Sequence, residues 1–251
     1  MISDPFFYLC AIPAVLLFGM AKGGLGGGPA MLSVPLMALV ISPIQAAAIL
    51  LPILVVMDFV AIWSFRGQWS RENLKVTLPG AIAGVVVGAF TFRYLSEDAV
   101  KLMIGLVALA FSLDYWLRRT IKPATGVSLT KGSFWGMVSG FTSFGIHSGG
   151  PPISVYLLPQ QLEKRQLMGT FAMFFTVVNL VKLVPYTWLG QFSTANLATS
   201  LALVPFAPVG VWLGYMALHR ISQKMIYQIS YAFLVAVGVK LSWEGVRGLL
   251  G

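Results

Sequence analysis

Six long apolar runs dominate this chain of 251 residues and restrict the folds open to it. Each run approaches the roughly 20 residues that an α-helix needs to cross the hydrocarbon core of a bilayer. The chain is 57% hydrophobic and only 10% charged, whereas a soluble domain carries about 25% charged residues. A soluble core cannot hold so much apolar surface, so the sequence predicts an all-α polytopic membrane protein. The predicted spans are 44–65, 76–95, 98–117, 166–188, 195–218 and 225–247.

Two further apolar regions are interrupted by glycine. Residues 5–20 and 29–41 flank the sequence GGLGGG, and residues 132–144 and 151–159 flank GIHSGG. Glycine is a poor helix residue and proline lacks a backbone donor, so a helix is expected to break at each motif. Every piece is shorter than the roughly 17 residues that would span a bilayer. Each pair of pieces is therefore expected to form a broken, re-entrant hairpin.

The two interrupted regions belong to an internal duplication. The glycines and proline of the first motif match those of the second, and GQWSRENL (67–74) matches GQFSTANL (190–197). A third match pairs Pro79, Gly84, Gly88 and Ser96 with Pro205, Gly210, Gly214 and Ser222. Its Gly-x-x-x-Gly spacing favours close helix packing over substrate contact. The sequence predicts two repeats, 1–122 and 123–251, each with a re-entrant hairpin and three transmembrane helices.

The distribution of basic residues orients the repeats. If each hairpin enters and leaves on one side, most Lys and Arg residues share one side of the membrane, and the other side receives Arg93, Lys101 and Arg247. Cytoplasmic loops are enriched in Lys and Arg, so the basic side is expected inside. Three spans per repeat then make the repeats inverted. Loop placement also explains the net charge of +9 without nucleic-acid binding.

The interrupted regions are the expected binding site. Irregular backbone at membrane depth is tolerated where it is buried in protein or lines a wet cavity. Half-helices are expected to begin at Pro29 and Pro151, where free N–H groups and the positive helix end attract an anion. A packing contact is the alternative for either motif alone. The motif residues assigned to substrate are Gly23, Gly24, Gly26, Gly27, Gly28, Ser148, Gly149 and Gly150.

A few ionisable side chains interrupt the apolar segments, and such residues usually face a pathway or a partner. Lys22 would add positive charge beside the first helix start, with snorkelling to an interface as the alternative. His147 would donate to an oxyanion, carry a proton or be satisfied in the core. Asp58 would neutralise a lysine or carry a proton. One helix face completes the expected substrate site with three residues, Asn179, Lys182 and Tyr186.

Other chemistries find little support in the sequence. GGLGGG lacks the Lys-Ser/Thr ending and the preceding strand of a nucleotide-binding loop. Two histidines and a single cysteine, Cys10, are too few and too scattered for a metal site, so no metal or cofactor is expected. No Ser/His/Asp arrangement indicates an enzyme. The first residues carry Asp4 and no basic segment, so they are expected to be retained and not removed as a signal peptide.

The chain resembles the TauE/SafE family of membrane transporters, also called sulfite exporters. The resemblance rests on GMAKGGLGGGPAMLSVPL, MDFVAIWSFRGQW, FTSFGIHSGGPPISVYLLPQ and GTFAMFFTVVNLVKLVPYTWLGQ. It implies a secondary transporter in the bacterial cytoplasmic (inner) membrane that moves a small sulfur-containing anion such as sulfite or an organosulfonate. Proton coupling through Asp58 or His147 is an option. Membrane lipid is the other expected partner, and a homodimer stays open. An anion channel and a non-transporting anion sensor or scaffold are the alternatives.

Overall fold

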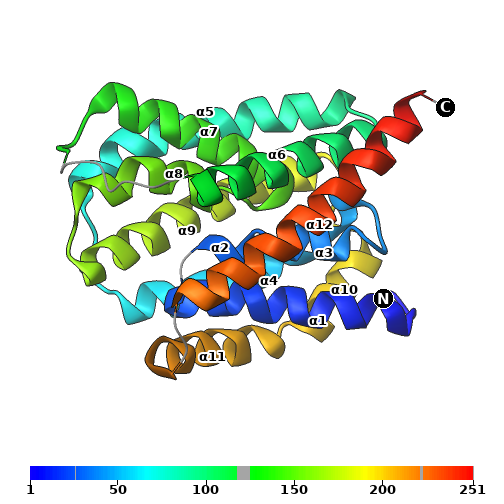
Figure 1. The fold of residues 1–251 in the computed structure, drawn as a ribbon, viewed down its shortest axis with the longest axis horizontal. Coiled ribbons are helices and arrows are strands. Elements are labelled where there is room, and N and C mark those ends of the chain that lie inside the picture. The colour runs from blue at the N-terminus through cyan, green and yellow to red at the C-terminus, as the bar shows by residue number, and fades with distance from the viewer. Residues whose placement is uncertain (26, 118–124, 221–222, 251) are drawn as a thin grey trace.

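The computed structural model describes residues 1–25, 27–117, 125–220 and 223–250, and every regular element in these residues is helical. Up to residue 117 the helices are α1 (Pro5–Met20), the π-helical turn η1 (Ala21–Leu25), α2 (Gly27–Ala30), α3 (Ser33–Met37), α4 (Pro43–Ser64), α5 (Arg71–Tyr94) and α6 (Glu97–Leu117). The later helices are α7 (Leu129–Ile146), α8 (Gly150–Leu157), η2 (Leu158–Gln160), α9 (Lys164–Trp188), α10 (Thr194–Leu203), α11 (Phe206–Arg220) and α12 (Gln223–Leu250). Figure 1 shows a bundle in which α12 crosses the other long helices at an angle.

The described helices include five that are long and apolar enough to cross a membrane. They are Pro5–Gly24, Pro43–Ser64, Arg71–Tyr94, Glu97–Leu117 and Lys164–Trp188. A sixth results if the bent pair Thr194–Leu203 and Phe206–Gly214 counts as one span. The last predicted run, 225–247, lies within α12. The prediction of an all-α polytopic membrane protein is therefore confirmed.

The prediction that all four pieces of the interrupted regions are too short to span is wrong for the first long arm. α1 continues through η1 to Gly24 as one apolar helix of 20 residues. The π turn includes Gly24, which has a φ of 131°. Glycine adopts this backbone angle at no steric cost, because it has no Cβ. The second long arm, α7, has 18 residues but is not among the helices found long and apolar enough to cross a membrane. The pieces after each motif are short, because the chain breaks again after α2 and after α8.

The predicted span 195–218 is not one straight helix. It is divided into α10 and α11, with a bend of 44° between them. The break falls at Val204 and Pro205, where proline lacks the N–H that would continue the helix and its ring crowds the preceding turn. Pro79, the matching residue in the first predicted repeat, stays inside α5. The two halves therefore differ at this position.

Both interrupted regions double back on themselves. Ser33 Oγ in α3 donates to Ala14 O in α1 at 2.7 Å, which places α3 beside the middle of α1. The hydroxyl of Tyr156, near the end of α8, accepts a hydrogen bond from Ser128 N, at the start of α7, at 3.2 Å. Each short arm therefore returns toward the end of the molecule where its long arm began (Figure 1).

Glycines hold two helix pairs at close range. A Cβ added to Gly84 of α5 would overlap the carbonyl oxygen of Met137 on α7. A Cβ added to Gly214 of α11 would overlap the carbonyl oxygen of Met20 on α1. The prediction that the Gly-x-x-x-Gly motifs serve close helix packing is confirmed. In both pairs the glycine-bearing helix packs against the long arm of the other predicted repeat.

Six of the described basic residues gather at one end of the bundle. Gly169 of α9 packs against Gln68, and Gly132 of α7 packs against Val76 of α5, so the α4–α5 link and the starts of α7 and α9 meet there. We call this the basic end, and its basic residues are Arg66, Arg71, Lys75, Lys131, Lys164 and Arg165. The other end, called the opposite end, carries Arg93, Lys101 and Arg247.

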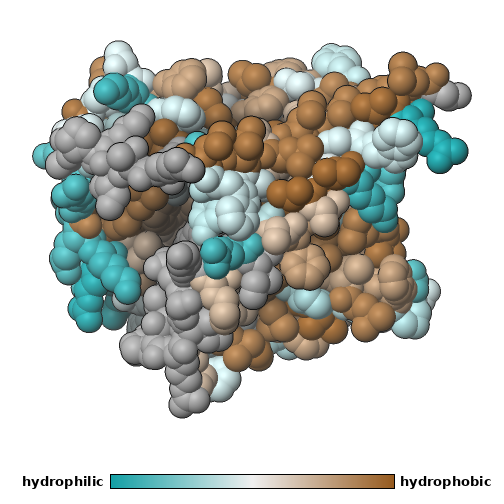
Figure 2. Space-filling model, in the orientation of Figure 1, coloured by the Kyte–Doolittle hydropathy of each residue, from teal (hydrophilic) through white to brown (hydrophobic). Residues whose placement is uncertain are grey.

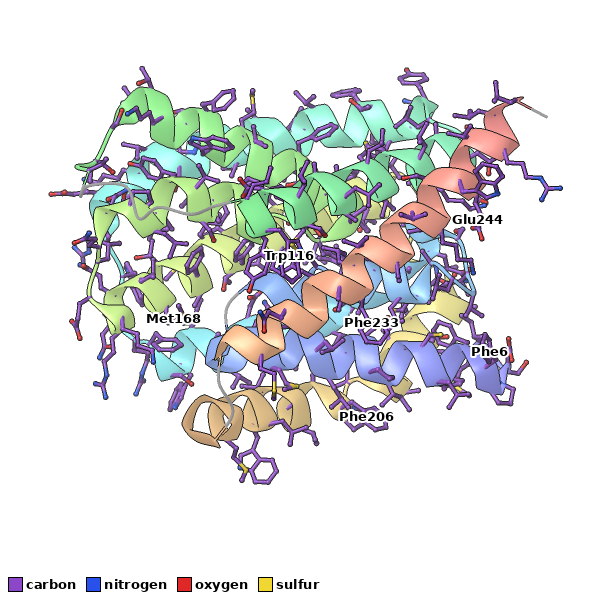
Figure 3. All side chains as sticks on the ribbon, in the orientation of Figure 1. Phe6, Trp116, Met168, Phe206, Phe233 and Glu244 are labelled. Atoms are coloured by element: carbon purple, nitrogen blue, oxygen red, sulfur yellow. The ribbon has the colours of Figure 1, made fainter. Side chains whose placement is uncertain are left out.

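Apolar and aromatic surface separates these two ends. Figure 3 shows Met168 and Glu244 at the two ends of the molecule and the exposed Phe233 of α12 between them. In Figure 2 hydrophilic surface lies mainly at the two ends, with hydrophobic surface over much of the middle. Exposed aromatic rings mark both ends, Trp63 near the basic end and Trp188 near the opposite end. This distribution is typical of a protein that crosses a membrane between two aqueous faces.

Candidate functional site

A cavity of about 450 Å³ lies where the two interrupted regions meet α4 and α9. It extends toward the basic end, where Lys164 is exposed at its edge. We call it the basic-end cavity. Several of the predicted site residues line it, namely Lys22, Gly24, Asp58, His147, Ser148, Gly150 and Asn179. Residues more than 100 positions apart in the sequence thus share one wall.

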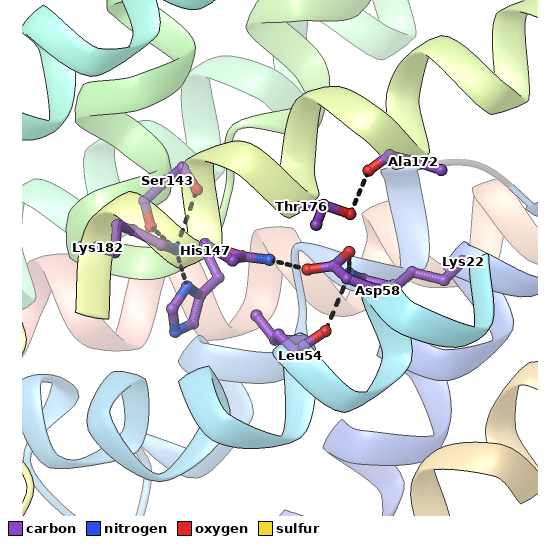
Figure 4. A network of polar contacts seen from close by, with 9 residues as sticks. Lys22, Leu54, Asp58, Ser143, His147, Ala172, Thr176 and Lys182 are labelled. Carbon is purple, nitrogen blue, oxygen red and sulfur yellow. Dashed lines mark hydrogen bonds and ion pairs between the residues drawn. The ribbon is translucent and has the colours of Figure 1, made fainter. Parts of the chain in front are cut away.

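An ion pair between Lys22 and Asp58 forms part of that wall. Asn179 Nδ2 donates to the second carboxylate oxygen of Asp58 at 2.6 Å, and Lys22 Nζ lies 3.4 Å from Leu54 O. Figure 4 shows these contacts, which connect η1, α4 and α9. Asp58 is 1% exposed, whereas Lys22 is partly exposed. Of the two alternatives for Asp58, the structure has the ion pair.

His147 and Lys182 form a second contact, deeper in the protein. His147 follows α7 in the left-handed region, with φ of 53°. Its Nδ1 lies 2.7 Å from Lys182 Nζ, and its Nε2 lies 2.9 Å from Ala47 O. Lys182 Nζ also donates to Ser143 O at 2.9 Å and to Ser143 Oγ at 3.2 Å. A lysine ammonium has three donors, and these three contacts use all of them.

Lys182 was predicted to bind substrate but lies outside the cavity lining, and its side chain is 0% exposed. Tyr186 donates instead to Phe144 O at 2.6 Å. Gly23 packs so tightly on α11 that a Cβ would overlap the carbonyl oxygen of Val211. Gly149 accepts a hydrogen bond from Ser139 Oγ at 2.7 Å through its carbonyl oxygen. For these two glycines the structure has the packing alternative.

The expected start of the first half-helix at Pro29 is wrong. α2 begins at Gly27 and ends at Ala30, and it includes Gly28. A helix of four residues aligns few peptide dipoles, so its N-terminus attracts an anion only weakly. Gly26, another glycine of this motif that was predicted to bind the substrate, lies outside the described residues.

The second half-helix also differs from its prediction. α8 begins at Gly150 and not at Pro151. Pro151 and Pro152 both lack an N–H, so two of the four donors at this helix start are missing. The polar character of the cavity therefore comes mainly from side chains.

Three polar residues near the site were not predicted. Ser143 binds Lys182, and Ser154 and Lys164 line the basic-end cavity. Ser143 lies one helical turn before His147, so the spacing of the two residues was a signal in the sequence. Lys164 carried no such signal, because a basic residue at the start of a predicted span is expected at the membrane surface.

The apolar spans, the interrupted helices and the internal cavity with ionisable walls define a multi-pass membrane protein of the transporter class. The chain belongs to the family described as Sulfite exporter TauE/SafE, whose profile matches residues 11–241. The chain is also similar to the probable sulfite/organosulfonate exporter TauE of Cupriavidus necator, with 26% identity over 172 residues. That match covers 64% of this chain and 64% of the relative. No solved structure matches the chain.

Proposed function

We propose that the chain is a secondary transporter of a small sulfur-containing anion, sulfite or an organosulfonate, and that the anion binds in the basic-end cavity. The family and the similarity to a probable sulfite/organosulfonate exporter support the substrate class. The charges of the cavity support the site. Among the described residues, Lys22 and Lys164 line it together with a single carboxylate, Asp58, which is already paired. An incoming anion therefore meets a net positive wall, and this observation carries the proposal.

The apolar part of the lining favours an organosulfonate. Leu167, Phe171 and Phe175 give the α9 side of the cavity an apolar stretch between Lys164 and Asn179, whereas the paired charges Lys22 and Asp58 belong to η1 and α4. A sulfonate headgroup would face Lys22 and Asn179, and an organic tail would lie against the α9 side chains. Burial of such a tail contributes about 0.8 kcal/mol per methylene group. We therefore expect propanesulfonate to bind more tightly than sulfite.

Asp58 is the proposed proton-coupling residue. Its carboxylate and an incoming anion compete for the same ammonium group of Lys22. Protonation of Asp58 removes the competing charge and frees Lys22, so the anion and a proton would bind together. Binding should then weaken as the pH rises, because the ionised carboxylate holds the lysine. His147 is the second candidate, but both of its ring nitrogens are occupied in this conformation.

Flux measurements in proteoliposomes test the proposal. We expect uptake of labelled propanesulfonate to saturate with concentration and to be driven by a proton gradient. Lys164→Gln should raise KM about threefold to tenfold, because it removes one of the charges that attract the anion. Arg165→Gln is the matched control, since Arg165 lies next in the chain but outside the cavity lining, and it should leave KM within about twofold. Flux that rises linearly with concentration would indicate a channel, and binding without flux would indicate a sensor.

We also propose that residues 1–122 and 123–251 are inverted repeats in the bacterial inner membrane, with the basic end in the cytoplasm. The opposite starting ends of the two hairpins support this arrangement. Ser70 begins α5 at the basic end, and Ser193 begins α10 at the opposite end. In a Cys10→Ala background, Glu72→Cys, in the exposed first turn of α5, should react with an impermeant thiol reagent from the cytoplasmic face and Ser193→Cys from the outer face. Labelling of both positions from one face would contradict the arrangement.

A further inference from the structure

A second cavity, of about 460 Å³, lies on the other side of α7 from the basic-end cavity. Ala47, Phe144, Gly145 and Tyr186 form its inner wall. It reaches the opposite end of the molecule, where the exposed Arg93 is part of its lining. Among the described residues predicted to bind substrate, Tyr186 lines it. We call it the opposite-end cavity.

Aromatic rings position Arg93 at this cavity, and these ring contacts do not use the N–H donors of its guanidinium group. Its guanidinium carbon lies 5.0 Å from the centre of the Trp188 ring and 5.8 Å from that of Tyr94. Trp188 is itself in edge contact with Phe90. Among the described residues no carboxylate lies within ion-pair distance of Arg93. A guanidinium positioned by aromatic rings keeps its fork of N–H groups available for two oxygens of an oxyanion.

A layer of contacts separates the two cavities, and we call it the occluding layer. It consists of Phe144, His147, Lys182 and Tyr186. Lys182 bonds His147 at 2.7 Å, and Tyr186 bonds Phe144 O at 2.6 Å while their rings touch edge to face. On α9 the layer lies between Asn179, which lines the basic-end cavity, and Trp188, which lines the opposite-end cavity. Two cavities open to opposite ends and closed from each other suit alternating access.

We infer that the opposite-end cavity is a second anion-binding vestibule, in which Arg93 receives a small sulfonate or related oxyanion on the far side of the occluding layer. This inference rests on the proposed function for the identity of the anion. The local chemistry is independent of it, because a cationic group in a cleft with apolar walls concentrates anions whether or not they are transported.

Thiol chemistry tests the vestibule without a transport assay. In a Cys10→Ala background, Gln191→Cys places a thiol in the opposite-end cavity, and Met168→Cys places one in the basic-end cavity. Both are treated in oriented membranes with two impermeant methanethiosulfonates, one carrying a sulfonate and the other a quaternary ammonium. The ratio of the two modification rates reports the local potential, because the ionisation of the thiol cancels. We expect Arg93→Gln to lower the sulfonate-to-ammonium ratio at position 191 about tenfold and to leave the ratio at position 168 unchanged.

Lys101→Gln is the matched control, since Lys101 lies at the same end but is paired with Asp98 at 3.3 Å; it should leave the ratio at position 191 unchanged. Arg93→Lys should keep most of the anion preference. An unchanged ratio in Arg93→Gln, or modification of positions 168 and 191 from the same face, overturns the inference. If the ratios change as expected while propanesulfonate shows no flux in proteoliposomes, the vestibule stands and the proposed transport function fails.

Discussion

Asp58→Asn should bind propanesulfonate about tenfold more tightly than the unmodified protein, and it should lose proton-dependent accumulation. The reason is the ion pair with Lys22, which an anion has to displace before it can use that lysine. Two opposite unit charges about 4 Å apart attract each other by roughly 4 kcal/mol at an effective dielectric constant of 20. The anion has to break this attraction, and its own attraction to Lys22 offsets most of the loss when it takes the carboxylate's place. Asparagine keeps the shape and an acceptor for Asn179 but carries no charge to displace.

The pH dependence gives the prediction a second readout. Affinity should fall with rising pH in the unmodified protein and should be independent of pH in Asp58→Asn, because the competing carboxylate is gone. Calorimetric titration of the purified protein across the pH range measures both effects. Asp98→Asn is the matched control, since Asp98 is also paired with a lysine but lies outside the cavity. Weaker binding in Asp58→Asn, or an unchanged pH profile, would show that the carboxylate does not compete with the anion.

Lys182→Met should abolish transport, lowering the initial rate at least about fiftyfold, yet leave the protein folded. The Lys182 amine is fully buried and contacts Ser143 and His147 but no carboxylate. A buried charge without a counter-charge carries a large desolvation cost, which an apolar side chain of similar length removes. The thermal midpoint of unfolding should therefore stay the same or rise. Transport should fail because the occluding layer loses the group that holds its histidine.

Initial rates in proteoliposomes and a thermal unfolding curve on the same preparation separate these two effects. Lys240→Met is a suitable control, because Lys240 is largely exposed and pairs with Glu244 within α12 at 3.6 Å. That variant should keep both its rate and its stability. Normal transport in Lys182→Met would remove the lysine from the mechanism, and a large fall in the thermal midpoint would assign it a structural role.

Much of the fold was readable from the sequence because the bilayer requires long apolar helices and close packing requires glycine. The spans and the packing of Gly84 and Gly214 follow from those two constraints. The break at Pro205 did not follow. Pro79 occupies the matching place in an unbroken helix, so the difference depends on tertiary contacts that no local pattern encodes.

The site was predictable as a set of residues but not as a set of contacts. A charged residue in an apolar span needs a partner, which brought attention to Lys22, Asp58, His147 and Lys182. The pattern could not assign partners. Lys22 pairs with Asp58, 36 positions away, whereas Lys182 pairs with no carboxylate and uses Ser143 and His147 instead. The sequence shows the two prolines at the start of α8. How many backbone N–H donors they remove from the helix N-terminus depends on the residue at which the helix begins, which the sequence pattern did not fix.

The contacts of His147 bear on proton leakage through the resting protein. Ala47 O can only accept, so Nε2 carries the ring hydrogen, and Nδ1 then accepts from the Lys182 ammonium. The ring has neither a free lone pair nor a free N–H, so it cannot take up or release a proton until one contact breaks. Both contacts lie at the barrier between the two cavities, because Lys182 belongs to the occluding layer and Ala47 lines the opposite-end cavity beside it. A proton could therefore pass through His147 only while that barrier opens. A carrier without bound substrate would then not leak protons down the membrane potential.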